Sequence, residues 1–241
     1  MNDIPDTRDF GLEIAALFES DAVGALPQKD LDPYSFAVLT VCTGNICRSP
    51  LAQALLRRQF RALSDAVGAP ADFSRVGSSG LGAVVGAPVD PAVLALGTEL
   101  GTKLASHRAR QFEPEHAEAA HLVLTATREQ RDRLVELAPG AGSRTFTLAE
   151  FARLLADREG DALFGAPAVP LQRPTRLSRH LQRLVEELNR ARQGAELFDS
   201  TPDSDDIEDP YRRSSETHRR VAAQIDELCA FIGERLRRAV A

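Results

Sequence analysis

Lysine is scarce in this 241-residue sequence, which contains two lysines, Lys29 and Lys103, against 27 arginines. A nucleotide-binding loop of the Walker type needs a lysine directly after its glycines, and neither lysine stands in such a loop. The net charge of −6 favours solubility and argues against a nucleic-acid partner. The composition therefore excludes a Walker-type nucleotide enzyme and disfavours a protein that binds DNA or RNA.

Cysteines and long apolar runs are also scarce. Three cysteines, an odd number, do not match the paired framework of a small secreted protein. No apolar run approaches the roughly 18 residues that a membrane-spanning helix needs. The first residues include Asp3, Asp6, Arg8 and Asp9 without the apolar core of a signal peptide. We therefore expect a soluble, cytoplasmic protein without a membrane span.

The most informative segment runs from Cys42 to Pro50 and consists of Cys-Thr-Gly-Asn-Ile-Cys-Arg-Ser-Pro. The apolar, β-branched run 36–41 precedes it and predicts a buried parallel strand. Residues 51–58, almost all strong helix formers, follow it, and Pro50 suits the first turn of their helix. A thiol is therefore expected at the end of a strand, in a short loop that opens onto a helix N-terminus.

This loop has the composition of a phosphate pocket with a nucleophile at its base. Successive backbone N–H groups of such a loop can point inward and form an anion cradle, which the helix dipole reinforces. Arg48 adds a planar fork that matches phosphate oxygens. The positive environment favours the thiolate form of Cys42 over the thiol. We predict Cys42 as the nucleophile and a phosphate-binding cradle that consists of Thr43, Gly44, Asn45, Ile46 and Cys47.

Strands and helices alternate from residue 36 onward. The patterns predict strands at 36–42, 73–78, 121–126 and 143–147, and helices at 50–66, 90–101, 128–138 and 148–157. This order predicts an α/β fold, a three-layer sandwich in which helices cover both faces of a four-stranded parallel sheet. Ligands of such sheets bind at the carboxyl ends of the strands, where Cys42, Ser78 and Thr125 are expected.

The chain is predicted to form one phosphate-binding domain over residues 36–241, with an N-terminal extension at 1–35 and a helical insertion at about 158–204. An arginine-rich helix of the insertion carries apolar residues at helical spacing: Leu177, Leu181, Leu184, Val185 and Leu188. The pattern favours a packed helix with a solvated basic face, and a membrane or an acidic partner is the alternative. Residues 199–209 predict a mobile acidic loop, and about 214–238 a final amphipathic helix.

A thiolate that attacks a phosphate monoester needs an acid to protonate the departing oxygen. Asp209 is the best candidate, because Pro210 stiffens the loop and biases Asp209 to an extended conformation. Asp205 and Asp206 are interpreted as solvated charges. Ser49 and Ser78 are the nearest hydroxyl groups that could stabilise the thiolate when it becomes the leaving group.

The nine residues from Cys42 to Pro50 match completely the signature Cys-x-Gly-Asn-x-Cys-Arg-Ser-Pro, and the chain thereby resembles the low-molecular-weight protein tyrosine phosphatases. The segments Asp209-Pro210-Tyr211, 76–80 and 107–111 resemble further motifs of that family. The resemblance implies a phosphomonoester hydrolase that acts on phosphotyrosine in proteins through a phosphocysteine on Cys42. It also implies that Asp209 is the general acid and that neither a cofactor nor a metal takes part. The residues expected to support the phosphate loop by hydrogen bonds are Asn45, Ser49, Ser78 and His107.

Two departures from the family pattern concern the arginine and the substrate pocket. The family commonly has an acidic residue shortly after the third strand that braces the loop arginine, whereas this chain has Thr127. An aromatic residue often walls the phenyl pocket, and here Ala83-Val84-Val85 stand in its place. The glycine-rich stretch 80–86 is interpreted as a loop and not as a dinucleotide site, because its third glycine falls one position late.

Three alternative functions stay open at this point. An arsenate reductase would usually have a different loop interior and resolving cysteines, whereas Cys229 is better interpreted as a core residue. A phosphoarginine phosphatase tends to have Thr where Ile46 stands, so Ile46 favours phosphotyrosine. A non-catalytic phosphate-binding regulator normally loses the nucleophile, the arginine or the acid. The family also offers precedent for a reversible disulfide between Cys42 and Cys47 as a redox switch, and a tyrosine kinase is a candidate partner.

Overall fold

The computed structural model describes residues 35–70, 72–157, 171–196 and 205–240. A four-stranded parallel sheet lies at its centre, and the strand order is β2-β1-β3-β4. The strands are β1 (Phe36–Cys42), β2 (Ser74–Gly80), β3 (Leu122–Thr125) and β4 (Thr145–Thr147). All seven residues of β1 are buried, because β1 pairs with β2 on one side and with β3 on the other. The predicted fold class is confirmed.

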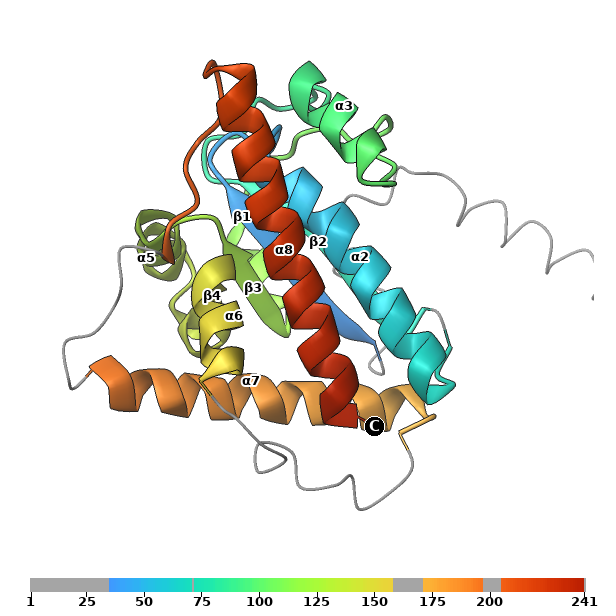
Figure 1. Cartoon of the computed structure of the whole chain (residues 1–241). Helices are drawn as coiled ribbons and strands as arrows, with labels where there is room; N and C mark the ends of the chain where they lie inside the picture. Colours follow the sequence, from blue (N-terminus) through green and yellow to red (C-terminus); the bar gives the residue numbers. More distant parts are fainter. Residues whose placement is uncertain (1–34, 71, 158–170, 197–204, 241) are drawn as a thin grey trace, which may run out of the picture.

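Two apolar clusters lie on opposite faces of the sheet, since successive side chains of a strand point to opposite sides. Phe36 and Val38 of β1 belong to one cluster, and Leu39 and Val41 belong to the other. The first face is covered by α2 (Arg48–Val67), α6 (Leu148–Ala156) and α8 (Ser215–Val240). The second is covered by α4 (Pro114–Glu118), α5 (Arg128–Leu137) and the 3₁₀ turn η1 (Pro139–Arg144). Figure 1 shows α2 and α8 side by side in front of the sheet.

Local sequence signals determine where several helices begin. Asp90 precedes α3 (Pro91–Glu99), and its carboxylate accepts a hydrogen bond from the backbone N–H of Ala92. Thr127 and Thr147 begin α5 and α6 in the same way, each with a Gln or Glu three residues later that completes a capping box. These signals explain why the predicted helices begin within a few residues of the observed ones, whereas the short α4 and η1 were not predicted.

The insertion contributes one long helix, α7 (Pro174–Glu196), which lies crosswise below α6 and α8 in Figure 1. Its five apolar positions, Leu177, Leu181, Leu184, Val185 and Leu188, are all buried in the main core. The hydroxyl of Ser178 donates a hydrogen bond to the carbonyl oxygen of Ser35, just before β1. The helix therefore packs on the domain, as predicted. Residues 1–34, 158–170 and 197–204, which include most of the predicted extension and loops, lie outside the described residues.

Candidate active site

The phosphate loop, Cys42 to Arg48, joins the end of β1 to the start of α2. Five of its carbonyl oxygens, those of residues 42 to 46, accept hydrogen bonds from residues outside the loop. The donors are the backbone N–H groups of Leu81, Gly82, Val84 and Asp90 and the Nε2 of His107. Among the described residues, no protein group accepts from the backbone N–H groups of residues 43–47. The loop carbonyl oxygens are hydrogen-bonded to residues outside the loop, so the loop N–H groups can bind an anion in its interior.

Two backbone features let the loop turn this tightly. Asn45 has a φ of 54°, in the left-handed region that Asn adopts more readily than most residues. Gly80, at the end of β2, lies against the loop so closely that a Cβ there would overlap the carbonyl oxygen of Thr43. The same Cβ would lie 3.0 Å from the backbone nitrogen of Asn45. Glycine at position 80 is therefore a steric requirement of the loop.

The Cys42 thiol is buried, and its Sγ lies 3.0 Å from the hydroxyl oxygen of Ser49. The side-chain amide of Asn45 donates to Ser49 Oγ (2.9 Å) and to Ser78 Oγ (3.0 Å). The Ser78 hydroxyl donates in turn to Gln53 Oε1 at 2.6 Å. The structure thus joins Cys42, Asn45, Ser49 and Ser78 in one buried network, and a hydroxyl donor stands beside the sulfur where a thiolate would need it.

The segment after α3 supports the loop from outside. His107 Nε2 lies 2.8 Å from the carbonyl oxygen of Asn45, which can only accept, so the neutral ring must carry its proton on Nε2. Burial lowers the pKa of His107, and the charges of Arg110 and Arg108 lower it further, whereas the bond to Asn45 opposes them. The backbone N–H of Arg110 donates to Asn45 Oδ1 (2.9 Å), and its guanidinium donates to the Ser78 carbonyl. Burial lowers the pKa of Arg110 to about 10.

Arg48 is 5 % exposed and lies at the far end of the loop from Cys42. Its Nη1 donates to the carbonyl oxygen of Ile207 at 3.0 Å, and its Nη2 lies 2.9 Å from Asp209 Oδ2. Thr127, the residue that replaces the family's acidic brace, begins α5 instead, and its hydroxyl accepts from the N–H of Gln130. Ile207 and Asp209, which precede α8, therefore supply the hydrogen-bond acceptors of Arg48, and Asp209 also supplies the opposite charge.

The interpretation of Asp205 and Asp206 as solvated charges is wrong. Asp205 is 2 % exposed and accepts two hydrogen bonds from Arg153 of α6. Asp206 accepts from the side chain and from the backbone N–H of Arg128 at the start of α5. The prediction of a mobile loop is equally wrong for residues 205–207, because two ion pairs and a buried Ile207 hold them. Acidic composition could not reveal arginine partners that lie more than 50 positions away in the chain.

The mouth of the loop has an apolar border. Val84 is 49 % exposed, and Val85 and Tyr211 are also exposed, although all three carry large apolar groups. A Cβ placed on Gly44 would lie 3.8 Å from Val84 Cγ2, so the exposed Val84 side chain lies beside the loop. Aliphatic residues thus take the place of the aromatic wall that the family often has, and they still offer apolar surface to a substrate ring.

The two other cysteines are buried and unbonded. Cys47 precedes Arg48 in the loop. Burial, together with the charges of Asp90, Cys42 and Asp209, raises its pKa to about 12. Cys229 of α8 is fully buried in the apolar core, and burial raises its pKa as well. Cys229 is therefore a core residue, as interpreted from the sequence.

Several polar residues around the site were not singled out from the sequence: Gln53, Arg110, Arg128, Gln130 and Arg153. Gln130 joins α5 to the phosphate loop, because its Nε2 donates to Thr43 Oγ1 at 3.0 Å. Its position three residues after Thr127, in a capping-box pattern, was a signal that could have drawn attention to it. Arg110 lies in the segment 107–111 that resembles a family motif, although no role was assigned to it. Gln53, Arg128 and Arg153 carry no local signal, since their partners come from distant parts of the chain.

In the parts of the chain that the structure describes, no cluster of His, Cys, Asp or Glu could hold a metal ion. None of the described helices is long and apolar enough to cross a membrane.

Comparison with known proteins gives a consistent family. The family model described as "Low molecular weight phosphotyrosine protein phosphatase" matches residues 37–162. A probable low molecular weight protein-tyrosine-phosphatase, EpsP of Ralstonia nicotianae, is 34% identical over 113 residues, which cover 47% of this chain and 70% of EpsP. A protein-arginine-phosphatase of Geobacillus stearothermophilus is 34% identical over 158 residues, which cover 64% of this chain and 96% of the relative. Among solved structures, the YwlE arginine phosphatase of the same organism superposes with a TM-score of 0.55 and 26% identity, over 83% of this chain and 92% of YwlE.

Proposed function

This chain belongs to the low molecular weight phosphotyrosine protein phosphatase family, and we propose that it hydrolyses phosphotyrosine in protein substrates through a phosphocysteine on Cys42. One observation carries the proposal. The Cys42 sulfur, the free N–H groups of the phosphate loop and the ion pair between Arg48 and Asp209 belong to one site at the carboxyl end of β1. A nucleophile, an anion cradle and an acid are the three parts that such a hydrolysis needs.

In the proposed first step, the substrate phosphate occupies the cradle and its oxygens accept from the loop N–H groups and from Arg48. The Cys42 thiolate attacks the phosphorus, so that an S–P bond forms while the bond from phosphorus to the phenolic oxygen breaks. Asp209 gives its proton to that oxygen as the bond breaks. Ser49 lies 3.0 Å from the sulfur and can donate a hydrogen bond to the thiolate.

In the second step, the Asp209 carboxylate takes a proton from a water molecule that attacks the phosphocysteine. The S–P bond breaks, inorganic phosphate forms, and the electron pair returns to sulfur as the thiolate. The Ser49 hydroxyl, held by Asn45, stabilises that leaving group. The cradle and Arg48 carry the charge on the equatorial oxygens throughout both steps.

Phosphotyrosine is the proposed substrate because the border of the site is apolar. Val84 lies beside Gly44 and is half exposed, and the exposed Tyr211 lies two positions after Asp209 in the chain. A phenyl ring buries more apolar surface on such side chains than the charged guanidinium of phosphoarginine would. Because a protein-arginine-phosphatase of Geobacillus stearothermophilus is similar to this chain, phosphoarginine is the alternative substrate. The proposed partner is a cytoplasmic tyrosine kinase, which forms the phosphoprotein that this enzyme hydrolyses.

The function is tested with phosphotyrosine, phosphoarginine and phosphoserine peptides of one sequence, with para-nitrophenyl phosphate as the general substrate. We expect hydrolysis of para-nitrophenyl phosphate, and among the peptides a preference for phosphotyrosine in kcat/KM. Cys42→Ser should abolish turnover but keep vanadate binding, because the cradle and Arg48 survive the change. Full activity of Cys42→Ser would contradict the mechanism, and a preference for phosphoarginine would contradict the substrate.

A further inference from the structure

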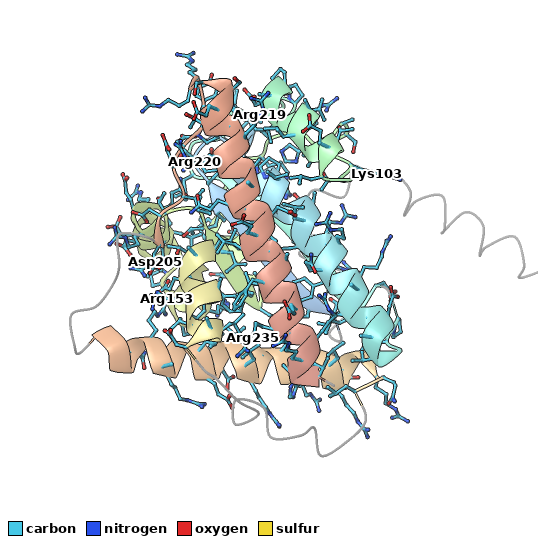
Figure 2. The ribbon with its side chains drawn as sticks, in the orientation of Figure 1. Lys103, Arg153, Asp205, Arg219, Arg220 and Arg235 are labelled. Atoms are coloured by element: carbon cyan, nitrogen blue, oxygen red, sulfur yellow. The ribbon has the colours of Figure 1, made fainter. Side chains whose placement is uncertain are left out.

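The acid loop, residues 205–210, is fixed to the domain by three successive residues. Asp205 is the most buried of its carboxylates, and its two oxygens face the guanidinium of Arg153 in a bidentate pair. Arg153 Nε lies 3.2 Å from Oδ1, and Arg153 Nη2 lies 2.8 Å from Oδ2. Figure 2 shows the two side chains next to each other, Arg153 on α6 and Asp205 at the start of the acid loop. A pair of this geometry fixes direction as well as distance.

Asp206 forms the second attachment, at the N-terminus of α5. Its Oδ1 accepts from the backbone N–H of Arg128 at 2.7 Å, and its Oδ2 accepts from Arg128 Nη2 at 3.1 Å. Burial acts to raise the pKa of Asp206, but the hydrogen bonds from Arg128 outweigh it and the pKa is lowered. The carboxylate is therefore held in its charged form by a helix end and an arginine together.

Ile207 connects the two ion pairs of Asp205 and Asp206 with Arg48 and Asp209. Its N–H donates to the carbonyl oxygen of Ala126 at 2.9 Å, and its side chain is 1 % exposed. Its own carbonyl accepts from Arg48 Nη1. Two residues later, Asp209 is 51 % exposed in its side chain, and its carboxylate contacts only Arg48 and the N–H of Tyr211 among the described groups. The direction of the Asp209 carboxylate therefore depends on the residues that precede it.

We propose that Arg128 and Arg153 are positioning residues, which hold Asp206 and Asp205 so that the acid loop presents Asp209 to the substrate phosphate. This inference rests on the proposed phosphatase function and deepens it. The two arginines come from α5 and α6, helices on opposite faces of the sheet, so the loop is held from both sides. Ile207 of this loop also contacts Arg48, but the backbone N–H groups of the phosphate loop bind the phosphate as well. The two arginines therefore matter more for proton transfer to the leaving oxygen than for binding of the phosphate.

The alternative is that the two pairs only stabilise the fold. A destabilised enzyme has a smaller folded fraction, which lowers kcat/KM for every substrate by one common factor. Because kcat/KM covers only the steps up to release of the phenol, a misplaced acid lowers it only where the leaving oxygen needs a proton. The ratio of kcat/KM for phenyl phosphate to kcat/KM for a dinitrophenyl phosphate therefore separates the two explanations, because the dinitrophenolate leaves without a proton.

The test compares this ratio in the wild type, in Asp206→Asn and in Asp205→Asn. Asp206 is about one-third exposed, so its variant should fold even if the buried Asp205→Asn does not. We expect kcat/KM for phenyl phosphate to fall about 10-fold or more, a part of the 10²–10⁴-fold that full loss of acid catalysis costs. We expect kcat/KM for the dinitrophenyl ester to fall less than about 3-fold, and the inhibition constant of inorganic phosphate to stay within about 2-fold.

Two matched controls break neighbouring ion pairs. Asp157 is the second partner of Arg153, at 3.7 Å, and it is well exposed. Glu208 lies in the acid loop itself and pairs with Arg220 at the surface. Exposed pairs of this kind contribute little, so Asp157→Asn and Glu208→Gln should leave the ratio as in the wild type.

An unchanged ratio in both Asp206→Asn and Asp205→Asn, beside a changed ratio in Asp209→Asn, would overturn the positioning role alone. A wild type that hydrolyses neither ester would overturn the proposed function and this inference with it. A changed ratio in either Asp205→Asn or Asp206→Asn, with unchanged controls, supports the positioning role.

Discussion

Arg48 Nη2 lies 2.9 Å from Asp209 Oδ2, so the anion-binding arginine and the proposed acid form an ion pair. A phosphate in the cradle would compete for the same guanidinium, because both are oxygen acceptors that suit its fork. Binding of the substrate would then free Asp209 at the moment when its proton transfer is needed. The pair thus links occupancy of the cradle to the position of the acid.

The first prediction concerns Asp209. Asp209→Asn should slow hydrolysis of phosphotyrosine by roughly 10²–10⁴-fold, because the amide cannot donate a proton to the leaving oxygen. The loss should be much smaller for an aryl phosphate with a very acidic phenol. The ratio kcat/KM for a series of aryl phosphates measures this dependence, because it covers only the steps up to release of the phenol. An equal loss for good and poor leaving groups would instead assign Asp209 to binding of the substrate.

The second prediction concerns the close approach of Gly80 to the phosphate loop. Gly80→Ala should displace the loop, because its Cβ would overlap the Thr43 carbonyl, and should cost about 1–3 kcal/mol of stability. The inhibition constant of inorganic phosphate should rise, and the midpoint of thermal unfolding should fall. Gly82→Ala is the matched control, since its Cβ would meet only Thr43 Cγ2 at 3.8 Å. Equal behaviour of the two variants would contradict the steric account.

The third prediction concerns pH and three half-buried histidines. Burial lowers the pKa of His107, His116 and His121 below the ordinary value of 6.5. The unfolded chain therefore takes up these protons at higher pH than the folded chain does. The stability that the neutral rings contribute is fully present above about pH 6.5 and is lost as the pH falls through their folded pKa values.

His121 gives the sharpest test of this pH dependence. Its Nδ1 accepts a hydrogen bond from the N–H of Ala37 at 2.9 Å, which a protonated ring cannot do. The midpoint temperature of unfolding should decrease as the pH is lowered from about 8 to about 5.5. In His121→Asn this decrease should be smaller. A midpoint that is constant over this range would contradict the prediction.

The fourth prediction concerns oxidation of the phosphate loop. Hydrogen peroxide should convert the Cys42 thiolate to a sulfenic acid. The Cys47 thiolate then attacks the sulfenic sulfur, so that the S–S bond forms while the S–O bond breaks and the hydroxyl group leaves as water. Because the pKa of Cys47 is raised to about 12, this closure should become faster as the pH rises. A thiol reductant should restore activity in the wild type but not in Cys47→Ser, where oxidation proceeds to the sulfinic acid. Mass spectrometry that finds a disulfide to Cys229 would refute the pairing.

Local patterns in the sequence were sufficient for most of the fold. β1 and the four helices predicted between residues 50 and 157 depend on apolar runs, capping residues and Pro or Gly boundaries, all of which lie within a few positions of one another. The nine residues from Cys42 to Pro50 likewise contain the nucleophile, the cradle and the arginine in one stretch. The short α4 and η1 lacked such a pattern and were not predicted.

The environment of the acid could not be predicted in this way. Asp205 and Asp206 stand in an acidic, polar stretch, and nothing beside them in the sequence indicates that Arg153 and Arg128 are their partners. For the same reason, the sequence shows only that Thr127 stands where the family commonly has an acidic residue, and it does not show which groups bind Arg48 instead. The carbonyl of Ile207 and the carboxylate of Asp209 are the partners of Arg48 instead, and they lie 80 and 82 positions after Thr127.

The most direct test of the mechanism is to trap the phosphoenzyme. A brief reaction of the wild type with a dinitrophenyl phosphate, quenched in acid within the first turnovers and analysed by peptide mass spectrometry, should find one phosphoryl group on Cys42. Asp209→Asn should accumulate more of this species, because hydrolysis of the phosphocysteine lacks its base, and Cys42→Ser should show no phosphocysteine. A phosphoryl group on any other residue, or turnover in Cys42→Ser, would contradict the account.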